Sequence, residues 1–213
     1  MSKRTAKVVT VGDGGCGKSS LLVRFCKDEF LHTYEPTMFE NYVAEIEFRP
    51  QYNMELTLFD TAGHTAYDRL RPLSYPDCDV VLVCFDLSQP GGIKEVEAKW
   101  IPELDKFCPH VPFILVGCKV DARHLEAVVV EDTDGQQKAL NEREVAKLAE
   151  SLGAYAYIEC SARVPHHILD VFALTAEASN IKRRKKVHRS SSQRKSKRKR
   201  TRRSKSSNSC VLM

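Results

Sequence analysis

Short apolar runs separated by longer amphipathic stretches organise the first 180 residues of the chain. Three runs are nearly all apolar and too short for helices, which predicts strands buried on both faces. These runs span residues 6–11, 80–85 and 112–117. Residues 42–48 and 54–59 alternate apolar with polar side chains around a turn at Asn53, which predicts a hairpin at one end of a sheet. A last strand is expected over residues 155–160.

Helical patterns alternate with these predicted strands. They span residues 18–25, 94–107, 141–152 and 168–179. Asn141 and Glu144 form an N-cap-x-x-Glu box, and Pro102 is compatible with a helix only near a kink or a boundary. Residues 28–39 and 122–139 lack a regular period, so we expect a loop and an irregular insertion. The alternation predicts an α/β fold of three layers, in which helices flank a mostly parallel, six-stranded, doubly wound sheet.

The first strand ends at a G-x-x-x-x-G-K-[ST] motif that opens a helix. Its glycines allow successive backbone N–H groups to turn toward an anion, and the helix N-terminus adds positive potential. The motif predicts that Lys18 binds the β- and γ-phosphates of a nucleotide and that Ser19 binds Mg²⁺. The predicted phosphate-binding residues are Gly12, Asp13, Gly14, Gly15, Cys16, Gly17, Lys18, Ser19 and Ser20. The alternative is a glycine-rich turn that binds nothing.

Other polar groups follow the ends of further predicted strands, which is where ligands bind in doubly wound sheets. Gly12, Asp60, Lys119 and Ser161 all lie at such ends, so one crevice can collect them. Asp60 can hold Mg²⁺ through water. Gly63 can donate its backbone N–H to a γ-phosphate, because it has no side chain to obstruct the approach.

The later motifs point to guanine as the base. Asp121 can accept hydrogen bonds from both N1–H and N2–H₂ of guanine, a donor pair that adenine lacks. The aliphatic stem of Lys119 can lie over the ring. The segment of Ser161, Ala162 and Arg163 can direct a backbone N–H, that of Ala162, toward the guanine carbonyl.

Together these motifs resemble those of the Ras-like small GTPases over about residues 6–180. Thr33–Tyr42 is similar to the first switch of the Rho branch, and Asp68–Pro76 is similar to its second switch. The insertion at 122–139 sits where Rho proteins carry an extra helix. The resemblance implies a P-loop NTPase G domain over residues 1–181 that binds GTP or GDP with Mg²⁺.

The resemblance also implies roles for residues of the first switch. Thr37 would bind Mg²⁺ and the γ-phosphate, Phe30 would lie edge-on against the base, and Tyr34 would close over the phosphates. Singly, Thr37 could be a loop hydroxyl, Phe30 a core residue and Asp121 a helix cap. Their joint spacing around the phosphate loop favours the functional interpretation.

The main departure from the family is His64, which follows Gly63 where typical members have Gln. That Gln accepts from the attacking water and donates to the γ-phosphate, whereas an imidazole is a rigid ring of different reach. We therefore expect slow GTP hydrolysis that is poorly stimulated by activating proteins, with Lys18, Gly63 and His64 as catalytic residues. The alternative is that His64 substitutes adequately and the protein cycles normally. Cys118 replaces an Asn or Thr, which predicts a looser link between base site and phosphate loop.

Within the Rho branch, several segments are most similar to the Rnd group, which is GTP-bound and hydrolysis-deficient. These segments are Gly12–Gly17, Cys84–Asp86, Gly117–Lys119 and the basic tail that ends in Met. Rnd proteins typically have Thr-Ser-Gly-Ser where this chain has Thr61–His64, and Asp68–Arg71 matches typical Rho proteins better.

Composition separates the chain into an acidic body and a basic tail. The chain has 213 residues, enough for one α/β domain, with no apolar run of membrane-spanning length and no signal-peptide core. Its eight cysteines form no C-x-x-C pair, which is typical of reduced cytosolic thiols. Residues 182–213 contain 15 Lys and Arg and no acidic residue, leaving a net charge of −10 on residues 1–181. We expect the tail to be disordered.

The tail ends Cys210-Val211-Leu212-Met213, a C-a-a-X box that predicts farnesylation of Cys210. A prenyl chain and a polybasic segment supply the two signals that stable anchoring needs. We expect attachment to the cytoplasmic face of the plasma membrane or endomembranes, with a cytosolic pool. Import into the nucleus through residues 195–203 is an alternative. Sequence-specific nucleic-acid binding is not expected, because no aromatic residue interrupts the basic run.

The sequence thus predicts a membrane-anchored, GTP-binding switch of the Rho type. The resemblance implies effector proteins at the switch loops, exchange factors, GTPase-activating proteins, prenyl-binding chaperones and signalling to the actin cytoskeleton. We expect a monomer. A normally cycling GTPase and a nucleic-acid binder acting through the tail are the competing interpretations.

Overall fold

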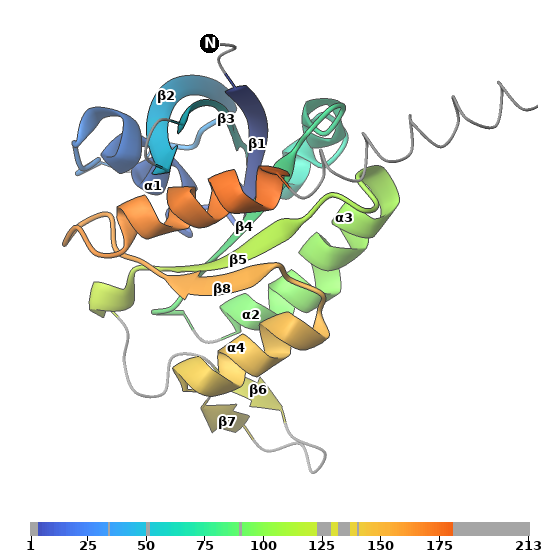
Figure 1. The fold of residues 1–213 in the computed structure, drawn as a ribbon. Coiled ribbons are helices and arrows are strands. Elements are labelled where there is room, and N and C mark those ends of the chain that lie inside the picture. The colour runs from blue at the N-terminus through green and yellow to red at the C-terminus, as the bar shows by residue number, and fades with distance from the viewer. Residues whose placement is uncertain are drawn as a thin grey trace, which may run out of the picture. The chain divides into compact units, whose positions relative to one another are not determined.

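The computed structural model describes residues 4–180, except 34, 50–51, 90, 123–128, 132–136 and 140. A six-stranded sheet in the order β2-β3-β1-β4-β5-β8 forms its centre (Figure 1). All neighbouring strands are parallel except β2 and β3, which form an antiparallel hairpin at one end of the sheet. The strands are β1 (Arg4–Gly12), β2 (Phe39–Arg49), β3 (Tyr52–Thr61), β4 (Val80–Asp86), β5 (Phe113–Cys118) and β8 (Ala156–Glu159). The predicted fold class is therefore confirmed.

The hydrophobic pattern explains where each strand lies. β4 and β5 are buried at every position, as expected for continuous apolar runs at the centre of a parallel sheet. The hairpin strands alternate instead: Met54, Leu56 and Leu58 of β3 are fully buried, while Val43 on β2 is 63% exposed. The hairpin therefore leaves one face toward solvent.

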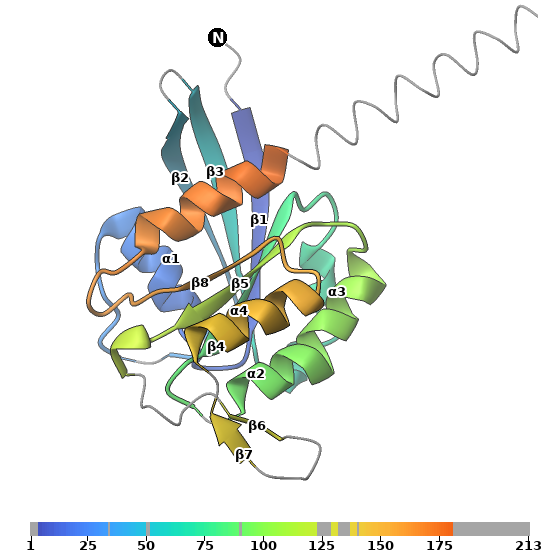
Figure 2. The same ribbon diagram turned by 60° about the horizontal axis from the view of Figure 1, so that its bottom comes forward.

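Helices cover both faces of the sheet and bury two separate cores (Figure 2). α1 (Lys18–Lys27) and the helix over residues 168–180 pack on one face, where the rings of Phe25 and Phe172 stack with centroids 3.7 Å apart. α2 (Gly92–Glu95), α3 (Ile101–Phe107) and α4 (Glu142–Ser151) pack on the other. This is the three-layer arrangement that the alternating pattern predicts.

The helix predicted over residues 94–107 is interrupted. A π-helical turn, η3 (Val96–Trp100), separates α2 from α3, and Pro102 lies in the first turn of α3. Proline has no backbone N–H, so it is tolerated where the hydrogen-bonding pattern changes. The expected boundary near Pro102 is confirmed, and the π turn directs the fully buried Trp100 into the core.

The insertion predicted over residues 122–139 is only partly described, so the extra helix that the family resemblance implies stays a prediction. In its described residues, β6 (Val129–Glu131) and β7 (Gln137–Ala139) form a short antiparallel pair, and no helical turn is present between residues 129 and 139 where the chain is described. β-branched valines at 129 and 130 favour extended backbone. The basic tail lies outside the described residues.

Candidate functional site

The phosphate loop joins β1 to α1 and depends on glycine at specific positions. Gly12, Gly15 and Gly17 have φ angles of +141°, +74° and +113°, which side chains on L residues disfavour. At Gly12 the restriction is also steric, because a Cβ atom would lie 2.1 Å from the carbonyl oxygen of Cys84. The loop therefore presents its backbone closely at the N-terminus of α1, as an anion site requires.

Lys18 lies along the inside of this loop. Its Nζ donates to the carbonyl oxygens of Gly12 and Asp13 at 2.8 and 2.7 Å, and the residue is only 6% exposed. These bonds hold the ammonium group over the loop, where it can bind phosphate as a point charge. Cys16 is packed beneath the loop, and burial raises the pKa of its thiol to about 12. The thiol is therefore unreactive at neutral pH.

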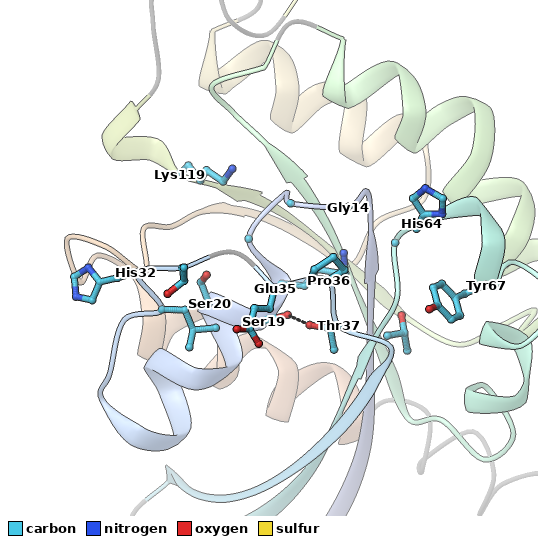
Figure 3. Close-up of a pocket in the computed structure, with 17 residues that line it drawn as sticks. Gly14, Ser19, Ser20, His32, Glu35, Pro36, Thr37, His64, Tyr67 and Lys119 are labelled. Carbon is cyan, nitrogen blue, oxygen red and sulfur yellow. Dashed lines mark hydrogen bonds between the residues drawn. The ribbon is translucent and has the colours of Figure 1, made fainter.

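The three oxygen-bearing side chains expected to bind a divalent cation come from three different segments. The hydroxyls of Ser19 and Thr37 are 2.8 Å apart (Figure 3). Asp60 is fully buried at the end of β3, and among the described residues neither of its carboxylate oxygens has a hydrogen-bond partner. Burial raises the pKa of Asp60 to about 6. The nearby Ser19 side chain and the positive charge of Lys18 lower this pKa and so partly offset the effect of burial. Hard oxygen ligands beside an uncompensated buried carboxylate fit Mg²⁺, which would neutralise phosphate charge there.

A cavity of about 220 Å³ collects the phosphate side of the site (Figure 3). Its lining comes from the phosphate loop, from residues 31–33 and 35–37, and from the segment after β3, including Gly63, His64 and Tyr67. Gly63 lies directly on the phosphate loop, since a Cβ there would be 2.3 Å from the Gly12 oxygen. This close approach explains why glycine is needed at position 63. Tyr34 lies outside the described residues.

His64 is exposed, and one of its two ring nitrogens is already used. Nδ1 accepts the backbone N–H of Ala66 at 3.2 Å and caps the short helix η1 (Thr65–Tyr67). An Nδ1 that accepts a hydrogen bond carries no proton in the neutral ring, so the proton is on Nε2. In this conformation His64 can donate a hydrogen bond through Nε2. Its acceptor atom, Nδ1, is already occupied by the Ala66 N–H.

The expected base-binding residues meet in a second cavity of about 160 Å³. Phe30, Cys118, Lys119, Asp121, Ala162 and Arg163 line it, together with Ser20 and parts of α1. The Ser161 hydroxyl donates to Asp121 Oδ1 at 2.5 Å and accepts the Val164 N–H at 3.0 Å, which fixes the Asp121 carboxylate. Most of the described residues that the sequence predicts for phosphate and base binding thus line two cavities that share Gly17, Ser20 and Lys119. The predicted residues that line neither cavity are Gly12, Asp13, Cys16, Asp60 and Ser161.

The link from the base site to the phosphate loop is made by packing. Cys118 is 3% exposed and lies close to the loop backbone. A Cβ atom placed on Gly17 would lie 3.1 Å from the Cβ atom of Cys118. A thiol is a weaker hydrogen-bonding group than an Asn or Thr side chain, so the looser link expected at Cys118 stays a prediction.

Three residues of the site were not predicted from the sequence. Asp86 Oδ2 accepts from Lys119 Nζ at 2.6 Å and holds the lysine stem beside the base cavity. Asp86 ends β4, so the rule that ligands bind past strand ends gave a signal for it. Trp100 and Arg71 also contact the site, from a helix and from the second switch, and no local pattern indicates this.

This fold and this site define a P-loop protein that binds a guanine nucleotide at the carboxyl edge of a parallel sheet. Comparison with known proteins defines the family more closely. The model of the Ras family matches residues 7–181. The GTP-binding protein rho5 of Schizosaccharomyces pombe is 47% identical over 176 residues, which cover 83% of this chain and 88% of that protein. The chain belongs to the Rho branch of the Ras family of small GTPases.

Membership of the family settles the general biochemistry. The protein binds GTP and GDP with Mg²⁺, is a GTPase and acts as a Rho-type switch. Its general partners are effectors, exchange factors and GTPase-activating proteins.

Proposed function

We propose that this Rho GTPase works as a persistently GTP-bound switch because its own hydrolysis is slow. The observation that carries the proposal is the bond between the Ala66 N–H and His64 Nδ1. A Gln side chain offers a carbonyl oxygen that accepts from the attacking water and an amide that donates to the γ-phosphate. With Nδ1 occupied, His64 keeps only the donor.

The expected cost is large because water positioning has narrow geometric tolerance. Losing a few kcal/mol from the transition state corresponds to about a hundredfold in rate. The phosphate loop does not supply an alternative explanation. Gly14 and Gly15 carry no side chains that block the γ-phosphate position. We therefore attribute the slow GTP hydrolysis to His64.

Single-turnover GTP hydrolysis by the His64→Gln variant tests this assignment. We expect hydrolysis at least about tenfold faster than in the parent chain. His110→Asn is the matched control, because His110 lies in an exposed loop outside the site and Asn tolerates its φ of +70°. Equal hydrolysis rates for the parent and His64→Gln would show instead that the protein cycles normally between GTP and GDP.

An exposed apolar surface on the two switches supports the expected effector site. Met38 and Phe39 of the first switch are 67% and 48% exposed, and Leu70 and Leu73 of the second are 59% and 75% exposed. Patches of this kind mark interaction surfaces. Effectors that signal to the actin cytoskeleton are the partners that the family favours.

Membrane attachment is proposed through Cys210, which lies outside the described residues. The C-a-a-X box and the basic run before it support a farnesyl anchor assisted by anionic lipid, on the plasma membrane or endomembranes, with prenyl-binding chaperones maintaining a cytosolic pool. None of the helices in the described part of the chain combines the length and the apolar character needed to span a bilayer. Similarity to the Rnd group in the phosphate loop and tail is consistent with a GTP-bound protein.

A further inference from the structure

A buried guanidinium lies between the second switch and helix α3. The Arg71 side chain, at the start of η2 (Arg71–Ser74), has 0% exposure. Its Nε and Nη2 donate to the two carboxylate oxygens of Glu103 at 2.7 and 2.6 Å, and Nη2 also donates to Asp68 at 2.6 Å. Burying a charge is costly unless it is paired and hydrogen-bonded. Two carboxylates meet that condition, so Arg71 is a fixed part of the fold.

The same guanidinium reaches the segment that carries the catalytic groups. Arg71 Nη1 donates to the carbonyl oxygen of Ala62 at 2.9 Å. That oxygen and the N–H of Gly63 belong to one planar peptide unit, and in a trans peptide they point in opposite directions. Holding the Ala62 oxygen therefore sets the direction of the Gly63 N–H.

Trp100 connects Arg71 and its two carboxylate partners, here called the Arg71 cluster, to the phosphate loop. The guanidinium carbon of Arg71 lies 4.5 Å from the centre of the Trp100 ring, and Trp100 Nε1 donates to Asp13 Oδ1 at 3.0 Å. Gly63 in turn packs on the loop backbone, since a Cβ there would lie 2.5 Å from the Asp13 carbonyl carbon. The phosphate loop therefore contacts both Trp100 and Gly63. Arg71 links these two contacts, because its guanidinium lies on the Trp100 ring and donates to the Ala62 carbonyl.

We propose that Arg71 is a positioning residue by which the protein distinguishes a nucleoside triphosphate from a diphosphate. It acts through the Ala62 carbonyl on the Gly63 N–H, the donor assigned to the γ-phosphate, which a diphosphate lacks. Because α3 and the phosphate loop hold the cluster, the N–H is oriented before nucleotide binds, and binding a triphosphate requires less ordering. The inference rests on the GTP-binding role of Gly63 and not on the rate set by His64.

The test is the ratio of affinities for two nucleotides in the Arg71→Lys variant of the full chain. Lysine keeps the charge but cannot contact both Glu103 oxygens and the Ala62 carbonyl together. Dissociation constants for GDP and for a non-hydrolysable GTP analogue are measured by competition with a fluorescent nucleotide in the presence of Mg²⁺. We expect the affinity for the GTP analogue to fall about tenfold and that for GDP to change less than about twofold.

Arg69→Lys is the matched control, because Arg69 is exposed two residues earlier in the same switch. It should leave both affinities unchanged. A purely structural role for Arg71 predicts an equal loss for both nucleotides, and that result would overturn the proposal. So would an unchanged ratio in folded Arg71→Lys protein.

Two further variants keep the test decisive if Arg71→Lys does not fold. Glu103→Gln weakens the pairing that holds the guanidinium, and Trp100→Phe keeps the ring but removes the bond to Asp13. Both should lower the ratio of GTP-analogue to GDP affinity in the same direction, and parallel losses would again contradict the proposal. Because the analogue is not hydrolysed, the outcome is independent of the His64→Gln comparison.

Discussion

Asp60 shows how a single residue can be unfavourable for the empty fold and useful for ligand binding. Its carboxylate is fully buried, and its oxygens have no hydrogen-bond partner within the described ranges. Burial raises its pKa to about 6, which reflects the cost of ionising it there. A bound Mg²⁺ ion would offset that cost, so the residue couples stability to ligand.

Replacing this carboxylate should separate the two effects. Asp60→Asn removes the buried charge, and we expect the free energy of unfolding of the nucleotide-free protein to rise by about 1–2 kcal/mol in urea denaturation. The same variant should lose the Mg²⁺ dependence of its GTP affinity. Asp77→Asn, at an exposed turn, should change stability by less than about 0.5 kcal/mol. A less stable Asp60→Asn protein would show that the buried carboxylate does not destabilise the nucleotide-free fold.

Residues fixed by local motifs were predictable, and residues fixed by distant partners were not. The glycines of the phosphate loop, Lys18 and Asp121 follow from short motifs whose chemistry requires them. The use of His64 Nδ1 by Ala66 depends on a turn that the sequence pattern does not specify. Likewise the partner of Lys119 is Asp86, on a neighbouring strand.

At the scale of elements, helix α4 illustrates a boundary set by local chemistry. The Asn141 side chain accepts the Glu144 N–H at 3.0 Å, and the Glu144 carboxylate accepts the Asn141 N–H at 3.0 Å. This reciprocal box satisfies two backbone donors that the first turn would leave unpaired. The predicted capping box is therefore confirmed.

The cap should contribute measurably to stability. Asn141→Ala removes the acceptor for the Glu144 N–H, and we expect the free energy of unfolding to fall by about 1 kcal/mol. Lys147→Ala, on the exposed side of the same helix, is the control and should change stability by less than about 0.5 kcal/mol. Guanidinium denaturation monitored by circular dichroism measures both. A loss of unfolding free energy no larger than that of the control would show that the capping box does not stabilise the protein.

Other elements depend on packing that a sequence pattern does not reveal. The apolar spacing over residues 94–107 is compatible with one helix, but Trp100 must fill the core between Arg71 and the phosphate loop. The π turn over Val96–Trp100 changes the angle at which that ring projects. The described part of the insertion, read as irregular, pairs with itself as β6 and β7, and such short pairing has little sequence signal.

At the scale of the whole molecule, charge divides the chain into two parts with different tasks. Residues 1–181 carry a net charge of −10, whereas residues 182–213 carry 15 basic side chains and no acidic ones. Basic residues near an anionic bilayer contribute up to about 1 kcal/mol each, and this attraction weakens as salt rises. The tail is thus the part suited to a membrane surface.

Together with the proposed farnesyl anchor at Cys210, this division predicts how the protein partitions onto vesicles. On vesicles of phosphatidylserine and phosphatidylcholine, binding should be stable, whereas Cys210→Ser should bind weakly and detach as salt is raised. On phosphatidylcholine alone, both forms should bind less, because the electrostatic signal is lost. Equal binding by the parent and Cys210→Ser in high salt would exclude the lipid anchor. Truncation after residue 181 should abolish vesicle binding and leave GTP binding intact.

We propose that His64 leaves this Rho GTPase loaded with GTP. The most direct test is the nucleotide bound to the full-length protein as purified, released by denaturation and separated by ion-exchange chromatography. We expect mostly GTP in the parent chain and mostly GDP in His64→Gln. Mostly GDP in the parent chain would show an ordinary cycling GTPase and would overturn the proposal of slow hydrolysis.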